Sequence, residues 1–231
     1  MLNLDQVDSF YGNSHILHGI TLGVEEGSIF TILGRNGMGK TTLLKTIMGL
    51  TDHVRGVIKL SNQVISSLPT YQRARSGFAY VPQGREIINQ FTVRENILMG
   101  CYARPDHQKE LPEFALDIFP YLRENLNRRA GLLSGGQQQQ LAIARALASQ
   151  PKILLLDEPT EGIQPNIVEQ IEHAIIRLNQ EFKLTILLVE QNVKFARKAS
   201  SHFVMMNNGY VAIGGPAAEL TDEVVHKFMT V

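Results

Sequence analysis

The sequence predicts an α/β fold, in which a mixed, mostly parallel sheet with helices carries an antiparallel β subdomain and an inserted helical subdomain. Three observations indicate this class. Residues 2–24 alternate between apolar and polar side chains, as antiparallel strands do. Apolar runs of strand length at residues 152–156 and 184–189 flank a helical pattern, which is the order of a parallel crossover. Between residues 84 and 150 the pattern becomes helical.

Turn and breaker residues divide the first part of the chain. Tyr11-Gly12-Asn13 and Glu25-Glu26-Gly27 separate the first strands. Gly49 ends the first helix, because glycine easily takes the left-handed conformation of a helix end, and Pro82 stops a strand. The expected elements are two strands around a hairpin at 2–24, a strand at 28–33, a helix at 42–48, a strand at 56–60, a helix at 68–76 and a strand at 78–81.

Residues 84–150 form the predicted helical subdomain. Apolar side chains recur at helical spacing around residues 93–98 and 116–122. The last helix of this segment runs from Ser134 to Ala148 and is closed by Pro151. Residues 1–83 and 151–231 then form the core with the antiparallel β subdomain, and the whole chain, 1–231, is a single domain.

The last part of the chain returns to strands. A helix at 167–178 separates the strands at 152–156 and 184–189. Asn207-Asn208-Gly209 is a favourable hairpin turn between strands at 203–206 and 210–213, because these residues accept a positive φ. A short helix is expected at 221–228.

The composition disfavours several functional classes. With 22 basic and 22 acidic residues the formal net charge is zero, which argues against a strongly cationic nucleic-acid binder. We expect the pieces Arg73-Ala74-Arg75 and Asn127-Arg128-Arg129 to be solvated helix faces. Cys101, the single cysteine, is expected to be a buried small side chain. His15 and His18 lie three apart in a strand and should point to opposite faces, which does not suggest a metal site.

We expect neither a targeting signal nor a membrane span in this sequence. Its apolar runs are of strand length, far shorter than the ~18 to 20 residues that cross a bilayer. The first residues lack a basic segment before an apolar stretch. We therefore expect a peripheral protein that stays on the cytoplasmic side and reaches a membrane only by docking onto other chains.

A glycine-rich loop between the strand at 28–33 and the first helix is expected to bind phosphate groups. Gly34-Arg35-Asn36-Gly37-Met38-Gly39-Lys40-Thr41 fits the spacing G-x-x-x-x-G-K-[ST]. Its glycines let backbone N–H groups surround phosphate oxygens, and the helix N-terminus adds its dipole. Lys40 can reach the β- and γ-phosphates, Thr41 can offer its hydroxyl to Mg²⁺, and Thr42 can meet the α-phosphate. A chance glycine loop is the alternative, but the flanking strand and helix favour a nucleoside triphosphate with Mg²⁺, as in P-loop NTPases.

Two acidic residues follow the apolar strand 153–156. Asp157 and Glu158 lie at its carboxyl end, where parallel sheets place their ligands. Asp157 can hold Mg²⁺ directly or through water, and Glu158 is the candidate general base that deprotonates the attacking water. The alternative is an acidic surface turn.

A second glycine-containing helix start is Leu133-Ser134-Gly135-Gly136-Gln137. Ser134 occupies the N-cap position, and the two glycines expose backbone donors, so this helix end suits an anion. A chain with one phosphate loop gains nothing obvious from a second one, unless the second completes a nucleotide site in another subunit.

With Gln83, these motifs in this order resemble the ABC ATPase family over nearly the whole chain. The resemblance implies an enzyme that binds and hydrolyses ATP. It implies that Tyr11, otherwise an ordinary strand tyrosine, stacks on adenine. It also implies that Gln83, otherwise part of a turn, contacts Mg²⁺ or the lytic water. Gln191 matches the position at which most relatives have a histidine that contacts the γ-phosphate, and an amide at this position provides weaker charge stabilisation.

The resemblance also implies a subunit arrangement. Two ATPase subunits face each other, and each ATP lies between the P-loop of one and Ser134, Gly135, Gly136 and Gln137 of the other. Residues 161–165 match the loop that crosses between subunits, although they depart from the usual Ser-Ala-Leu-Asp. The helical subdomain would pass motion to membrane permeases through residues 86–94.

Two segments resemble the corresponding sequences in the ATPases of importers for branched-chain amino acids and amides, at residues 158–163 and 189–192. Three others are similar to those of urea importer ATPases, at residues 11–17, 34–37 and 82–87. The resemblance implies a second, different ATPase chain, two permeases and an extracytoplasmic binding protein, with a homodimer possible in isolation and no nucleic acid. The alternatives are the ATPase of another ABC system such as lipopolysaccharide export, a soluble non-transport ABC ATPase, and a non-catalytic nucleotide-binding regulator.

Overall fold

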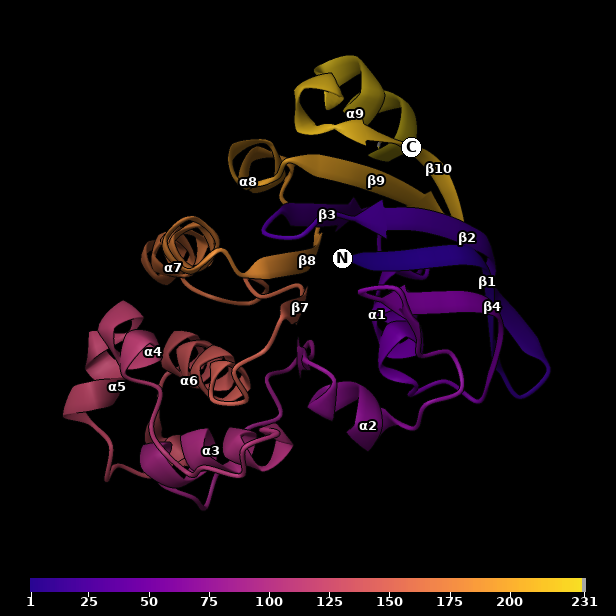
Figure 1. Cartoon of the computed structure of the whole chain (residues 1–231). Helices are drawn as coiled ribbons and strands as arrows, with labels where there is room; N and C mark the ends of the chain where they lie inside the picture. The colour runs from indigo at the N-terminus through magenta and orange to yellow at the C-terminus, as the bar shows by residue number, and fades with distance from the viewer. Residues whose placement is uncertain (230–231) are drawn as a thin grey trace. The chain divides into compact units, whose positions relative to one another are not determined.

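The computed structural model describes residues 1–229, so the last two residues of the expected core lie outside the described part. Figure 1 shows the course of the chain. The chain forms two compact units: one joins Met1–Arg73 to the chain from Thr185 onward, and the other is Ala74–Leu184. Each unit buries aliphatic and phenylalanine side chains in its core.

The first unit begins with an antiparallel sheet. Its strands are β1 (Leu2–Tyr11), β2 (Ser14–Val24), β4 (His53–Leu60) and β5 (Gln63–Val64), in the order β2-β1-β4-β5. Leu2 and Leu4 of β1 are buried and Asn3 and Asp5 are exposed, which is the alternation that predicts such strands, and a register shift between Leu4 and Val7 then places the next buried residue at Val7. The predicted antiparallel β subdomain is present.

A second sheet in this unit places β3 (Ile29–Leu33) between β8 (Thr185–Glu190) and β9 (His202–Asn207). β3 is parallel to both neighbours, and β10 (Tyr210–Pro216) pairs antiparallel with β9. Every residue of β3 and β8 is buried, as expected of parallel strands that are covered on both faces. The mixed, mostly parallel sheet of the predicted fold class is therefore confirmed.

Helices follow the strands of this sheet. α1 (Lys40–Met48) comes after β3, α8 (Val193–Ala199) after β8, and α9 (Asp222–Met229) after β10. Figure 1 shows α8 and α9 beside β9 and β10, and their apolar side chains pack with those of β3 and β9 around Leu33 and Phe203.

The second unit pairs β6 (Phe78–Val81) in parallel with β7 (Ile153–Asp157). Its helices are α3 (Val93–Gly100), α4 (Glu113–Ile118), α5 (Pro120–Glu124), α6 (Gly135–Leu147) and α7 (Pro165–Phe182). α6 packs against each of the other four, and its Leu141, Ile143 and Leu147 are fully buried. α2 (Thr70–Arg75) spans the sequence boundary between the units.

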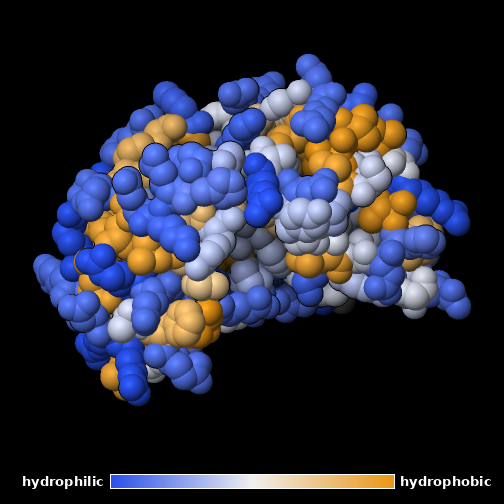
Figure 2. Space-filling view, turned by 60° about the horizontal axis from the view of Figure 1, so that its bottom comes forward, coloured by the Kyte–Doolittle hydropathy of each residue, from blue (hydrophilic) through white to orange (hydrophobic). Residues whose placement is uncertain are grey.

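The surface is predominantly polar where Figure 2 shows it: hydrophilic side chains cover most of this face, and apolar side chains form separate groups. Large apolar side chains that remain exposed include Met99, Tyr102 and Leu132. Within residues 1–229, no helix combines the length and the hydropathy of a membrane span.

The expected strands and helices are present, with their ends shifted by a few residues. The first helix begins at Lys40 rather than Thr42, so the lysine of the P-loop is its first residue. The sequence pattern did not predict β5 or α8. α8 begins because the side chain of Asn192 accepts a hydrogen bond from the N–H of Phe195 at 3.2 Å, which caps a helix directly after β8.

The expectation that His15 and His18 point to opposite faces is wrong, because their ring centroids lie 4.0 Å apart. The register between β1 and β2 shifts where Phe10 pairs with His15, so that Ile16 is an extra residue in β2. Such a bulge interrupts the alternation of faces. Both imidazoles therefore lie in one stack, between the rings of Phe10 and Tyr210.

The expectation of solvated arginine pieces is wrong for Arg73, whose relative exposure is only 2%. Its guanidinium donates to the carbonyl oxygens of Thr46, Ile47, Ser66 and Leu68 at 2.6–2.9 Å. Two of these carbonyl oxygens belong to the last turn of α1, where the helix itself supplies no N–H groups to donate to them, so they need donors from outside the helix. Arg73 therefore caps α1 with a charge that suits a helix C-terminus.

Replacing Arg73 with alanine should lower the free energy of unfolding by about 2 to 4 kcal/mol, because several buried carbonyl oxygens lose their donor at once. Burial lowers the pKa of Arg73, but the guanidinium still carries its charge near neutral pH. Urea denaturation followed by circular dichroism measures the effect. The matched control is Arg75→Ala on the exposed side of the same helix, which should change stability by no more than about 0.5 kcal/mol. Equal effects of the two variants would contradict the capping role.

Candidate functional site

The P-loop connects β3 to α1 and depends on its glycines. Gly34, Gly37 and Gly39 have φ values of +152°, +80° and +98°, a region that L-residues rarely adopt. A Cβ on Gly34 would also lie 2.8 Å from the carbonyl oxygen of Met206. The loop therefore needs glycine at these positions, which agrees with the prediction that its backbone binds phosphate.

Lys40 is the first residue of α1 and has a relative exposure of only 4%. Its Nζ donates to the carbonyl oxygen of Arg35 at 2.9 Å, so the ammonium lies inside the curve of the loop. Thr41 and Thr42 follow in the first turn of the helix and are partly buried. The structure thus brings the phosphate-binding candidates into one segment, with a cation at its centre.

Neighbouring elements of the first unit hold the P-loop in place. In the β9–β10 turn, the N–H of Gly209 donates to the carbonyl oxygen of Met38 at 3.1 Å, and the N–H of Asn208 approaches Met38 Sδ at 3.3 Å. Tyr11, the residue proposed for adenine, ends β1 opposite Ser14 and is 37% exposed. Its ring is therefore accessible at the tip of the first hairpin.

Gln191 follows β8 and reaches the same loop. Its Nε2 donates to Asn36 Oδ1 at 2.8 Å, although the two residues are 155 positions apart. Both side chains are exposed. The structure therefore brings two of the sequence-predicted residues, Asn36 and Gln191, into direct contact.

In the second unit, Asp157 and Glu158 lie at the carboxyl end of β7. Asp157 is fully buried, and Tyr80 donates its hydroxyl to Asp157 Oδ2 at 3.1 Å. Glu158 is 8% exposed and has a φ of +46°, which costs of the order of 1–3 kcal/mol for a residue with a side chain. Because both carboxylates are buried, the alternative interpretation of Asp157 and Glu158 as an acidic turn on the surface is wrong. Sequence reasoning missed Tyr80, whose position in the neighbouring strand β6 was the available signal.

Gln83 follows β6, and its Nε2 donates to Glu161 Oε2 at 2.5 Å. Arg85 and Glu86, directly after Gly84, both have positive φ values of 72° and 46°. Arg145 of α6 donates to the carbonyl oxygen of Arg85 at 3.0 Å and to that of Glu86 at 2.7 Å. Hydrogen bonds therefore join residues 83–86 both to α6, through Arg145, and to the loop after Glu158, through Glu161.

The helix start at Ser134 has the predicted form. The N–H of Gln137 donates to Ser134 Oγ at 3.4 Å, and Gln137 Oε1 accepts from the N–H of Ser134 at 2.9 Å, which is a capping box. The guanidinium of Arg85 lies beside Gly135, so a cation accompanies this helix end. A Cβ on Gly136 would overlap Ile167 of α7. Gly136 is thus needed for close packing as well as for exposing the backbone.

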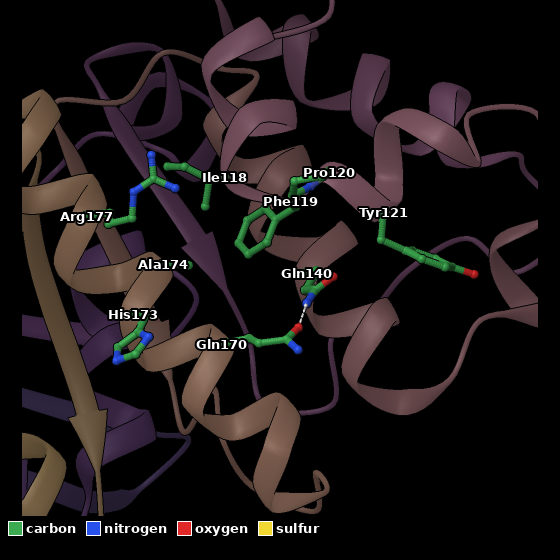
Figure 3. A pocket seen from close by; sticks show the side chains of 9 residues that line it. All are labelled: Ile118, Phe119, Pro120, Tyr121, Gln140, Gln170, His173, Ala174 and Arg177. Carbon is green, nitrogen blue, oxygen red and sulfur yellow. Dashed lines mark hydrogen bonds between the residues drawn. The ribbon is translucent and has the colours of Figure 1, made fainter.

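A pocket of about 290 Å³ lies among α4, α5, α6 and α7 of the second unit. Figure 3 shows Gln170, His173 and Arg177 along one side of α7, with Gln140 Nε2 donating to Gln170 Oε1 at 3.2 Å. None of its lining residues is among the predicted site residues. The pocket is therefore separate from the phosphate-binding motifs, and the glutamine pair fastens α6 to α7.

The oxygen donors available for a metal ion suit a hard cation. They are the Thr41 hydroxyl in the first unit, and the Asp157 carboxylate and Gln83 amide oxygen in the second. A fully buried carboxylate such as Asp157 is itself expensive without partners, and Tyr80 supplies one of them. These residue types fit Mg²⁺. Within residues 1–229, no group of three or more histidine, cysteine, aspartate or glutamate side chains is arranged to hold a metal ion.

Comparison with known proteins agrees with this geometry. A family model described as "ABC transporter" matches residues 17–161. The chain is 40% identical over 222 residues to the high-affinity branched-chain amino acid transport ATP-binding protein BraG of Pseudomonas aeruginosa, covering 95% of this chain and 94% of BraG. It is also 40% identical to the probable branched-chain amino acid transport ATP-binding protein LivF of Archaeoglobus fulgidus, covering 96% of this chain and 94% of LivF. Among solved structures, a dimeric ATP-binding cassette in a post-hydrolysis state with ADP and Pi has a TM-score of 0.82 at 26% identity, covering 94% of this chain and 99% of that one.

Proposed function

Since the chain belongs to the ABC transporter family and is an ATPase of that family, we propose that it is the ATP-hydrolysing subunit of an importer for branched-chain amino acids or a related amide such as urea. The observation that carries the proposal is the 40% identity to BraG and LivF, which extends over almost the full length of all three chains. The motifs at residues 11–17, 34–37 and 82–87 support urea as the amide.

ATP binds at the P-loop in this proposal. The backbone N–H groups of residues 34–41 and the hydroxyl of Thr42 meet the phosphates, and Lys40 exchanges the carbonyl oxygen of Arg35 for phosphate oxygens. Tyr11 stacks on the adenine through its accessible ring. Mg²⁺, when bound with ATP through Thr41, Asp157 and Gln83, would neutralise charge on the β- and γ-phosphates.

Hydrolysis requires a base and donors around the terminal phosphate. Glu158 accepts a proton from the attacking water, and its strained backbone fixes the direction of the carboxylate. Gln83 orients the water, and its bond to Glu161 is compatible with this role because the amide has a second N–H and a carbonyl oxygen. Gln191 donates an N–H to the γ-phosphate but cannot supply the charge of an imidazolium.

The site is shared between two ATPase subunits. Ser134, Gly135, Gly136 and Gln137 of one subunit present the α6 N-terminus to the ATP that the P-loop of the other binds. ATP therefore closes the pair, and loss of the γ-phosphate opens it. Residues 84–150, the proposed helical subdomain, pass this motion to two permeases. The partner ATPase is a different chain in the assembled importer. Binding to the permeases keeps this subunit at the cytoplasmic face of the membrane.

Uptake by a strain that lacks this gene tests the proposal. Loss of radiolabelled leucine uptake, restored by the wild-type gene but not by Lys40→Ala, supports an amino acid importer. The same pattern with radiolabelled urea supports the amide. Normal uptake of both compounds, or a defect confined to export, contradicts the proposal. Co-purification with integral membrane proteins distinguishes a transporter subunit from a soluble ABC ATPase.

A further inference from the structure

Gln191 is held at its position by two different attachments. The first is through its backbone: the carboxylate of Glu190, a residue only 3% exposed, accepts from the N–H groups of Gln191 and Asn192 at 3.1 and 3.3 Å. Asn192 in turn caps α8 through the N–H of Phe195. The corner between β8 and α8 is therefore fixed, and Gln191 projects from a rigid base.

The second attachment is through the side chain, from Gln191 Nε2 to Asn36 Oδ1. Asn36 lies between Arg35, whose carbonyl oxygen accepts from Lys40, and Gly37 with its positive φ. The acceptor therefore belongs to the loop that surrounds the phosphates. A long glutamine side chain would otherwise sample several rotamers, and fixing it in advance removes that entropy cost from the reaction.

We propose that Asn36 is a positioning residue for Gln191: by accepting one N–H of its amide, Asn36 directs the nitrogen end of that amide to the terminal phosphate. This inference depends on the proposed function, because it requires that Gln191 act on bound ATP. A primary amide carries two N–H donors, so donation to Asn36 is compatible with donation to a phosphate oxygen. Rotation of the amide by 180° would instead present its carbonyl oxygen to the phosphate and repel it. An uncharged glutamine depends on such orientation.

A double-mutant cycle tests the inference. Asn36→Ala should lower kcat for ATP hydrolysis by about 3- to 10-fold, the value of one neutral hydrogen bond, and Gln191→Ala by about 10- to 100-fold, because it removes the donor to the charged phosphate itself. The double variant should lose no more than the more damaged single variant, because both changes remove the same oriented donor. KM for ATP should stay within about twofold in all three, because orientation of one donor acts on the chemical step.

Asn36→Asp separates positioning from a general disturbance of the loop. Its carboxylate still accepts from Gln191, so kcat should stay closer to that of the wild type than in Asn36→Ala. KM should rise because the new negative charge repels the phosphates. The matched control is Gln63→Ala in the exposed strand β5, which should leave both constants unchanged.

Three results would overturn the inference. These are losses in kcat that multiply in the double variant, an Asn36→Ala variant that is as fast as or faster than the wild type, and an Asn36→Asp variant as slow as Asn36→Ala. In each case an active wild-type enzyme shows that the proposed function survives and that only the role of Asn36 fails. A wild-type chain that hydrolyses no ATP, either alone or together with its partner ATPase, would instead overturn the proposed function.

Discussion

Glu158→Gln is expected to lower steady-state ATP turnover by about 10²- to 10⁴-fold, because the amide cannot accept the proton of the attacking water. Glutamine has nearly the same shape as glutamate, so it can occupy the same strained, buried strand end after β7. ATP binding should therefore persist while hydrolysis stops. The expected consequence is a closed pair of subunits that accumulates with ATP, visible as a nucleotide-dependent shift to larger size in gel filtration.

The matched control for this variant is Glu169→Gln, which makes the same chemical change at an exposed position of α7. It should hydrolyse ATP at the wild-type rate and show no trapped pair. Phosphate release and binding of a fluorescent ATP analogue measure the two effects separately. Wild-type turnover in Glu158→Gln would show that another group is the base.

In isolation, where the chain can pair with itself, two inactive variants should regain activity when they are mixed. Lys40→Ala loses the P-loop cation, and Ser134→Asp places a carboxylate where the neighbour's phosphate should bind. Aspartate is as good an N-cap as serine, so α6 should remain folded in the second variant. A mixed pair of subunits has one intact site, formed by the P-loop of the Ser134→Asp chain and the α6 N-terminus of the Lys40→Ala chain.

At equal concentrations, and where the two sites of a pair act independently, the mixture should reach about a quarter of the wild-type rate, because half of the pairs are mixed and each has one working site of two. Each variant alone should stay inactive at every concentration. Chemical crosslinking of differently tagged chains establishes that mixed pairs form. Mixed pairs without recovered turnover, or full activity of Ser134→Asp alone, would contradict a site shared between subunits.

Elements with a strong local pattern could be predicted from the sequence. The P-loop strand, the helix after Ser134 and the hairpin turn at residues 207–209 carry glycine, N-cap and alternation signals that act over a few residues. These signals were sufficient for the fold class and for placing Asp157 at a strand end. The short strand β5 offers only two residues and no pattern to detect.

Tertiary contacts account for what the sequence could not give. The local sequence around Arg73 does not distinguish it from a surface arginine, because the four carbonyl oxygens that accept from it come from other segments. Similarly, the sequence around Ile16 does not indicate the bulge that brings His15 beside His18. Likewise, the hydrogen bonds of Asn36 to Gln191 and of Gln83 to Glu161 join residues far apart in the chain. Such pairings depend on how distant segments meet, which single-residue properties do not encode.

The bond between Lys40 and the carbonyl oxygen of Arg35 affects how tightly a nucleotide can bind. An incoming triphosphate does not give this ammonium its first acceptor but replaces a neutral oxygen with an anionic one. Because the ammonium already makes a charge-assisted bond, the lysine contributes to affinity the difference between that bond and an ion pair with the phosphate. In return, the bond holds the curl of the loop in place, so that association with a nucleotide loses little backbone freedom.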